Sequence, residues 1–212
     1  MPSRSDPAAR DLASPFEAEP DQDLRDLVVR NPGQASFEEY RYVRETIRRR
    51  APGNVLVFGV GRDSGFWLDA NEDGTTEFVE HEPEWIAQTR KHLPGIVIHR
   101  VTYETRRHQW KRLLRRHDKL FMEDLPNPVL ATNWDVIFVD SPQGASRRRP
   151  GRMKSIYTAS ILARRSTNVD VLVHDCDRVV EQAYSERFLG PERLVHEVRT
   201  LRHFRMRPSR DG

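Results

Sequence analysis

The stretch Asn54-Val55-Leu56-Val57-Phe58-Gly59-Val60-Gly61-Arg62-Asp63-Ser64 decides the fold. Its first five residues have the apolar, β-branched pattern of a buried strand, and Gly59-Val60-Gly61 follows at once. A second strand pattern, 76–79, ends in Glu80, about 20 residues beyond the glycine turn. Strand, glycine turn, helix, strand and acid, in this order, are typical of a nucleotide-cofactor site. The glycines let the backbone approach the ligand, and the acid binds the ribose hydroxyls.

The glycine turn indicates which cofactor to expect. Ser64 occupies the position of the third glycine in the dinucleotide fingerprint. This departure favours a smaller adenosine cofactor, S-adenosylmethionine, over a dinucleotide. The alternative interpretation, an ordinary Gly-x-Gly turn, is weakened by the preceding strand and by Glu80.

Length, charge and cysteine content limit the classes of protein. A chain of 212 residues suits one domain. Its net charge of +3 comes from local arginine runs, which are either a solvated surface or a binding site for an anion. Cys176 is the only cysteine, which excludes an intrachain disulfide and a cysteine-based zinc site. No signal peptide or membrane span is recognisable, so we expect a cytoplasmic protein without membrane contact. The oligomeric state stays open.

The chain divides into two parts. Residues 1–34 are rich in proline and charge and predict a disordered leader. Residues 35–208 predict one domain, opened by a capping box at Ser36 and Glu39. Strands are predicted at 54–58, 75–80, 96–103, 134–140 and 169–175, with helices at 36–50, 63–70, 83–92, 105–117, 152–165 and 178–188. This alternation predicts an α/β fold of the Rossmann-like type, a mostly parallel sheet with helices on both faces.

Polar side chains end several of the predicted strands. Because ligands bind at the carboxyl ends of such strands, we expect these side chains to line the site. The candidate catalytic residues are Asp140, Asp175 and His174, although a turn cap or a core histidine would explain each of them. The candidate cofactor-binding residues are Phe58, Gly59, Val60, Gly61, Ser64, Glu80, His81, Tyr103, Asp140 and Ser141. A divalent cation held by Asp140, Asp175 and Asp177 is a weaker hypothesis.

Several motifs, in order, resemble the plant glucuronoxylan 4-O-methyltransferase family and its irregular-xylem relatives. They are Gly-Val-Gly-Arg-Asp-Ser at 59–64, Phe-Val-Glu-His-Glu-Pro-Glu-Trp-Ile at 78–86, Trp-Asp-Val-Ile-Phe-Val-Asp-Ser-Pro-Gln-Gly at 134–144, Pro-Gly-Arg-Met-Lys-Ser-Ile-Tyr-Thr-Ala at 150–159 and Val-His-Asp at 173–175. The resemblance covers residues 54–206. It implies a class I methyltransferase that uses S-adenosylmethionine, in a family that methylates glucuronic acid in xylan or arabinogalactan.

The chain departs from the plant pattern mainly in its acceptor half. The plant members carry an amino-terminal Golgi anchor, and this sequence has none, so we expect a soluble short member. Gln143-Gly144-Ala145-Ser146 and three arginines replace an aromatic motif, and His-Asp-Cys-Asp at 174–177 replaces His-Asp-Val-Asn. The resemblance therefore supports the fold and the cofactor of this chain more strongly than it supports the acceptor.

The leading hypothesis is an O-methyltransferase with an acidic acceptor, either a glucuronic-acid hydroxyl or a small-molecule carboxylate. A hydroxyl needs a base, whereas a carboxylate needs a cationic clamp. The candidate substrate-binding residues are Arg152, Arg149, Tyr157 and Gln143. The alternative is a non-catalytic protein that binds an acidic glycan. A nucleic-acid substrate is not expected, because Asp-Ser-Pro-Gln at 140–143 lacks the motif of amine methylation.

Overall fold

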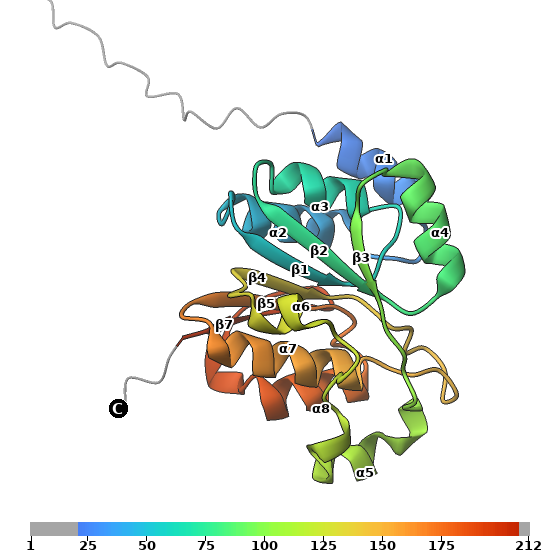
Figure 1. Ribbon diagram of the computed structural model, residues 1–212, viewed down its shortest axis with the longest axis vertical. Helices are drawn as coiled ribbons and strands as arrows, with labels where there is room; N and C mark the ends of the chain where they lie inside the picture. Colours follow the sequence, from blue (N-terminus) through green and yellow to red (C-terminus); the bar gives the residue numbers. More distant parts are fainter. Residues whose placement is uncertain (1–20, 208–212) are drawn as a thin grey trace, which may run out of the picture.

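The computed structural model describes residues 21–207, which fold around one seven-stranded sheet (Figure 1). The strand order is β3-β2-β1-β4-β5-β7-β6. The strands are β1 Asn54–Phe58, β2 Thr75–Glu80, β3 Val97–Arg100, β4 Val136–Val139, β5 Val169–Val173, β6 Leu194–Val198 and β7 Leu201–Met206. Strands β1 to β5 pair in parallel, whereas β7 is antiparallel to both β5 and β6. The predicted α/β fold with a mostly parallel sheet is confirmed.

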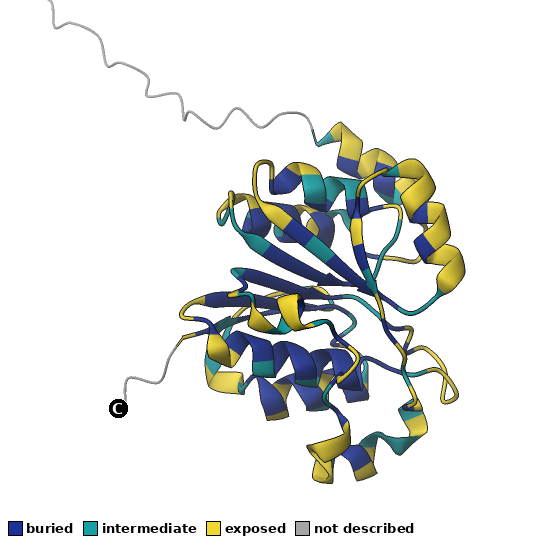
Figure 2. Cartoon of the chain, viewed as in Figure 1, coloured by how far each residue is buried: buried dark blue, intermediate teal, exposed yellow. Residues whose placement is uncertain are grey.

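Helices cover both faces of the sheet (Figures 1 and 2). They are α1 Gln22–Arg30, α2 Phe37–Arg48, α3 Ser64–Ala70, α4 Pro83–His92, α5 Trp110–Arg115, α6 Asn127–Ala131, α7 Met153–Arg165 and α8 Val179–Phe188, with 3-10 turns η1 Arg107–Gln109, η2 His117–Lys119 and η3 Pro191–Arg193. Side chains alternate along β1, so that Val55 and Val57 pack with α1 to α4, and Leu56 and Phe58 pack with α5 to α8.

The strand order places a binding crevice at β1 and β4. From β1 the chain proceeds to β2 and β3 on one side, and from β4 to β5 on the other. The two loops that leave β1 and β4 therefore diverge and open a crevice at the carboxyl ends of these strands.

The predicted boundary of the amino-terminal leader is wrong. Residues 22–30 form α1, whose Leu24 and Leu27 are buried against the core. The guanidinium of Arg44 forms ion pairs with Asp21 and Asp23, which fixes α1 on α2. The prediction weighted the prolines and missed two leucines spaced for one helical face. Residues 1–20, which belong to the predicted leader, lie outside the described residues.

Several other predicted elements differ from expectation, and β4 and β5 are shorter than the strands predicted at 134–140 and 169–175. Strand β3 ends at Arg100 rather than at residue 103, and the predicted helix 105–117 divides into η1, α5 and η2. The capping box is confirmed: Ser36 Oγ accepts from the backbone N–H of Glu39 at 3.3 Å, and Ser36 N donates to Glu39 Oε2 at 2.8 Å. Within 21–207, no helix has the length and apolar character needed to cross a membrane.

Candidate active site

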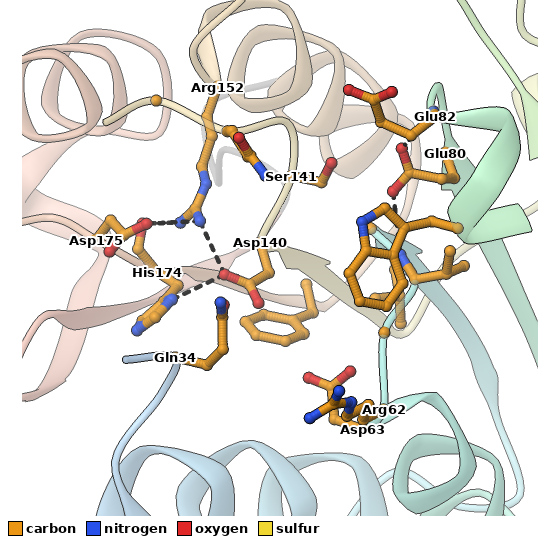
Figure 3. Close-up of a pocket in the computed structure, with 18 of the residues that line it drawn as sticks. Gln34, Arg62, Asp63, Glu80, Glu82, Asp140, Ser141, Arg152, His174 and Asp175 are labelled. Carbon is orange, nitrogen blue, oxygen red and sulfur yellow. Dashed lines mark hydrogen bonds and ion pairs between the residues drawn. The ribbon is translucent and has the colours of Figure 1, made fainter. Parts of the chain in front are cut away.

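A cavity of about 310 Å³ lies at the carboxyl ends of β1, β2, β4 and β5 (Figure 3). Its wall includes the glycine turn after β1, the acid that ends β2, and polar residues that follow β4 and β5. These segments are distant in sequence, and the parallel sheet brings them to one edge, as predicted.

The glycine turn allows the β1 and β4 loops to approach closely. Gly59 has a φ of 120°, and a Cβ atom there would lie 2.9 Å from the Cβ of Ser141. The hydroxyl of Ser64 accepts from Gly61 N at 3.0 Å, which closes the turn where α3 begins. The backbone of the turn is thereby left open to the cavity.

Glu80 is held ionised at the rim of the cavity. Its Oε1 accepts from the backbone N–H groups of His81 at 2.5 Å and Glu82 at 2.8 Å, and Val60 N donates to Oε2 at 3.3 Å. Burial raises the pKa of Glu80, but hydrogen bonds from His81 and from these amides outweigh it, so the pKa is lowered. The long contact at Oε2 leaves this oxygen available to a ribose hydroxyl.

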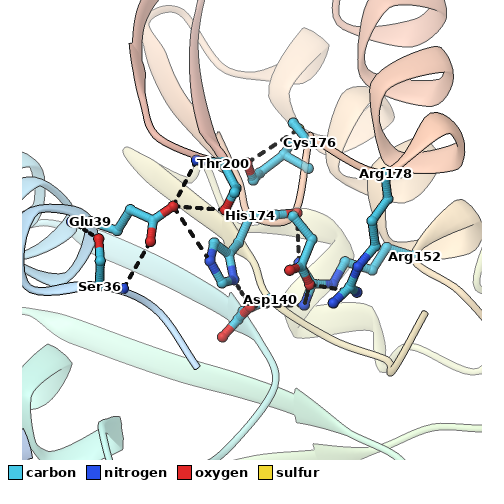
Figure 4. A network of polar contacts seen from close by, with 10 residues as sticks. Ser36, Glu39, Asp140, Arg152, His174, Cys176, Arg178 and Thr200 are labelled. Carbon is cyan, nitrogen blue, oxygen red and sulfur yellow. Dashed lines mark hydrogen bonds and ion pairs between the residues drawn. The ribbon is translucent and has the colours of Figure 1, made fainter. Parts of the chain in front are cut away.

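A continuous polar network crosses the floor of the cavity (Figure 4). Asp140 Oδ1 lies 2.9 Å from Arg152 Nη2 and 2.8 Å from His174 Nδ1. Arg152 Nη2 also lies 2.6 Å from Asp175 Oδ2, and Arg152 Nη1 donates to the carbonyl of His174 at 2.6 Å. On the far side, His174 Nε2 lies 3.7 Å from Glu39 Oε1. Every charge in the network faces an opposite one.

These contacts decide which groups are charged. Burial lowers the pKa of His174, but the carboxylate of Asp140 and hydrogen bonds to Asp140 and Glu39 raise it to about 10. Burial raises the pKa of Asp140, but His174 and Arg152 lower it below its usual range. At neutral pH the imidazole is therefore protonated and unsuited to act as a base. Asp140 is ionised, and its hydrogen bonds to other described residues all fall on Oδ1, so Oδ2 keeps its lone pairs.

A second buried acid faces the same cavity. Burial, and then the charge of Asp140, raises the pKa of Asp63 to about 7. Asp63 precedes α3 at the glycine turn, and no salt bridge to it occurs within residues 21–207. A cation bound in the cavity would stabilise its ionised form.

Most of the predicted site residues line the cavity. They are Gly59, Val60, Gly61, Glu80, His81, Asp140, Ser141, Gln143, Arg152, His174 and Asp175. Arg152, however, is not a free clamp: its side chain is only 6% exposed, and two carboxylates and a carbonyl already accept from it. An anionic acceptor would have to compete with Asp140 and Asp175 for this guanidinium.

Five predicted residues lie outside the cavity lining. Phe58 is buried in the core. Ser64 is buried as well, and its hydroxyl accepts from the backbone N–H of Gly61. The hydroxyl of Tyr103 lies 2.9 Å from that of Ser155, and its ring meets the ring of His81 edge to face. Tyr157 stacks on His117, remote from Asp140. Arg149 is exposed at the rim, where its Nη1 lies 3.7 Å from Glu82.

The structure adds residues that the sequence analysis missed. The loop between α1 and α2 contributes Asn31, Gly33 and Gln34 to the cavity, and Figure 3 shows the Gln34 side chain beside Asp140. Trp85 of α4 also lines the cavity. Trp85 could have been predicted, because it belongs to the family motif at 78–86 that also contains Glu80. The α1–α2 loop could not, because residues 1–34 were assigned to a disordered leader.

The acidic residues do not form a good metal site. Atoms of Asp140, His174 and Asp175 lie within 4.8 Å of one another, whereas Asp177 is exposed and apart from this group. The guanidinium of Arg152 already bridges the two carboxylates, and the histidine is protonated. Metal ligands must be deprotonated, so a cation would have to displace both a proton and the arginine.

The fold, the glycine turn after β1 and the acid that ends β2 together define a class I methyltransferase domain. A proposed caffeoyl-CoA O-methyltransferase from Staphylococcus aureus superposes with a TM-score of 0.52 at 12% identity, covering 90% of this chain and 93% of that one. The similarity at this identity concerns the fold alone.

The chain belongs to the IRX15/IRX15L/GXM family, whose sequence model matches residues 38–119 and 115–204. It is 37% identical to Arabinogalactan O-methyltransferase 2 of Arabidopsis thaliana, over 81% of this chain and 66% of the relative. It is 35% identical to Glucuronoxylan 4-O-methyltransferase 3 of the same plant, over 81% of this chain and 63% of the relative. The chain thus spans about two thirds of the length of these relatives. The resemblance found in the motifs is confirmed.

Proposed function

We propose that this protein is an S-adenosylmethionine-dependent O-methyltransferase whose acceptor is a hydroxyl group of a uronic acid. The observation that carries the proposal is the convergence of the glycine turn, Glu80 and an ionised Asp140 on one cavity. The relatives named above are O-methyltransferases of polysaccharides, which supports both the reaction and the class of acceptor.

The residues of the cavity suit the cofactor. Gly59 and Gly61 allow close approach of its methionine part, and Glu80 Oε2 accepts from a ribose hydroxyl. The indole of Trp85 adds an apolar surface to the cavity lining. Asp63 and Asp140 supply negative charge opposite a cationic ligand.

The network favours a hydroxyl acceptor over a carboxylate. A carboxylate needs no base and would be repelled by Asp140, since the two cations beside it, Arg152 and His174, are already paired. A hydroxyl is a poor nucleophile and needs a proton acceptor within hydrogen-bond reach. Asp140 Oδ2 provides that acceptor. The uronate carboxyl would face Arg178, which lines the cavity and whose one ion pair within residues 21–207 is with Asp175.

The chain contributes positioning, charge and a proton acceptor. The sulfonium of the bound cofactor supplies an electrophilic methyl group. With the cofactor bound, Asp140 would accept the proton of the acceptor hydroxyl as that oxygen takes up the methyl group, and it would later release this proton to solvent. Arg152 and His174 hold the Asp140 side chain in place, and holding the acceptor in line with the methyl group is the main source of rate.

The test combines transfer and product chemistry. Labelled S-adenosylmethionine is incubated with a trisaccharide that ends in glucuronic acid and with its carboxyl-reduced, neutral analogue. We expect an alkali-stable methyl ether on the acidic sugar, and a loss of rate of about 100-fold or more in Asp140→Asn. Methanol released by alkali would mean an ester and a carboxylate acceptor. Cofactor binding without turnover on any acidic glycan would support the non-catalytic alternative. The cytoplasmic location expected from the sequence remains a prediction.

A further inference from the structure

One strongly basic surface of the protein has no part in the reaction described above. The segments 106–119 and 147–149 contain ten of the 35 Lys and Arg residues of the chain, but only one of its 32 Asp and Glu residues, Asp118. We call the exposed cations of these segments the basic ridge. They are Arg106, Lys111, Arg112, Arg115, Arg116, Lys119, Arg147, Arg148 and Arg149.

Backbone contacts join the two segments into one surface. Arg107 N donates to the carbonyl of Arg149 at 2.8 Å, and His108 N donates to that of Arg147 at 3.2 Å. Helix α5, at the lower end of the molecule in Figure 1, is anchored by buried Leu113 and by the Tyr184 hydroxyl, which donates to the Trp110 carbonyl at 3.0 Å. The cations of the basic ridge are therefore held on a fixed backbone.

The charge of the basic ridge is largely uncompensated. Among the residues that the structure describes, only Arg149 of this set forms an ion pair, with Glu82 at 3.7 Å. Exposed like charges repel one another at low ionic strength, and a bound polyanion relieves this repulsion. If these arginines served only to keep the surface solvated, they would not have to be concentrated on two segments that hydrogen bonds hold together.

The basic ridge starts at the mouth of the cavity. Glu82, the partner of Arg149, lines the cavity, and so do Gln143, Gly144 and Ala145 at the start of the loop that carries the three arginines. A ligand that lies along the ridge is therefore led to the cavity that contains Asp140. A single sugar or a small carboxylic acid would fill the cavity without reaching α5.

We propose that the basic ridge is a docking surface for a polysaccharide that carries several uronic acid residues. One residue enters the cavity while the carboxylates of others contact the arginines of α5 and of the 147–149 loop. This inference rests on the proposed function and extends it, because it specifies a polymer rather than a small molecule as acceptor. Several weak contacts along one chain add their free energies, so affinity depends on acceptor length and falls with salt.

The test uses a ridge variant and a matched control. The ridge variant combines Arg112→Gln, Arg115→Gln and Arg116→Gln, whose side chains form no hydrogen bond or ion pair with other described residues. The control combines Arg48→Gln, Lys91→Gln and Arg187→Gln, which are also exposed and remove the same charge from three other helices. Circular dichroism and cofactor affinity verify that each variant is folded.

The first measurement is binding of fluorescent polygalacturonate, which needs no turnover. We expect the ridge variant to bind about tenfold more weakly, from roughly twofold for each of three exposed pairs, and the control to bind within about twofold of wild type. Equal losses in both variants, or no binding by wild type at low salt, would overturn the proposal. So would a poly(U) oligonucleotide that binds more tightly than polygalacturonate and depends on the same arginines.

The second measurement separates this inference from the proposed function. With a glucuronic-acid-bearing xylan and its trisaccharide as acceptors, the ratio of the KM for polymer to that for trisaccharide should rise about tenfold in the ridge variant only. An unchanged ratio refutes the docking surface while leaving the methyltransferase intact. Transfer to neither acceptor refutes the proposed function, and the binding measurement still decides on the ridge.

Discussion

Replacing His174 by Asn should destabilise the protein in a way that depends on pH. The imidazolium lies 2.8 Å from Asp140 Oδ1 and 3.7 Å from Glu39 Oε1, and the residue is only 6% exposed. Its pKa rises from 6.5 to about 10, with burial opposing the shift and Asp140 and Glu39 causing it. Since each pKa unit corresponds to about 1.36 kcal/mol, protonated His174 contributes about 4 kcal/mol at pH 7 and about 1 kcal/mol at pH 9.

The sign of the pH dependence follows from the direction of the shift. Because the pKa of His174 is higher in the folded state, its protonated ring contributes its full stabilisation below pH 6.5. This contribution is lost as the pH rises through about 10. The pKa values of Asp140 and Glu39 are lowered instead, so their contribution is present above the usual carboxyl range and is lost in acid. Together His174, Asp140 and Glu39 therefore contribute most to stability from mildly acidic to neutral pH.

Urea denaturation of wild type and His174→Asn at pH 7 and pH 9 measures the effect. Wild type should lose about 2 to 3 kcal/mol more than the variant over this interval, because only wild type releases a proton from His174 when it unfolds. Tyrosines and Cys176 titrate in both proteins and cancel in the comparison. Equal losses would show that the imidazole is neutral at pH 7 and would return it to the candidates for the base.

Three further predictions concern the cavity. Calorimetry should show S-adenosylmethionine binding more tightly as the pH rises from 6 to 8, because the carboxyl of Asp63, with a pKa of about 7, ionises opposite the cation; Asp63→Asn should remove this slope. Gly59→Ala should cost about 1–3 kcal/mol in urea denaturation and weaken cofactor binding, since φ is 120° and the new Cβ meets Ser141. A chelator should leave the transfer rate unchanged, because Arg152 occupies the place of a cation; a rate restored only by added metal would refute this.

The local pattern of the sequence determined the architecture and the cofactor side of the site. Strand β1 alternates between two buried faces and runs into Gly59-Val60-Gly61, and a strand that ends in an acid follows. Period, turn residues and chain order are local properties, so the parallel sheet and the position of Glu80 could be predicted from them. Helix α1 had a local signal as well, because Leu24 and Leu27 are spaced for one helical face, but only their packing in the fold shows that they belong to the core.

The acceptor side was decided by tertiary contacts. The sequence predicted that Asp140, Arg152, His174 and Asp175 lie near one edge of the sheet. It did not predict which of them pair with one another. Only the folded chain brings Arg152 between two carboxylates and Glu39, from a helix more than 130 residues away, next to His174. Protonation states depend on burial and on charges a few ångströms away, and these are set by how distant segments pack. For this reason the protonation states on which the proposed base depends could be assigned only from the structure.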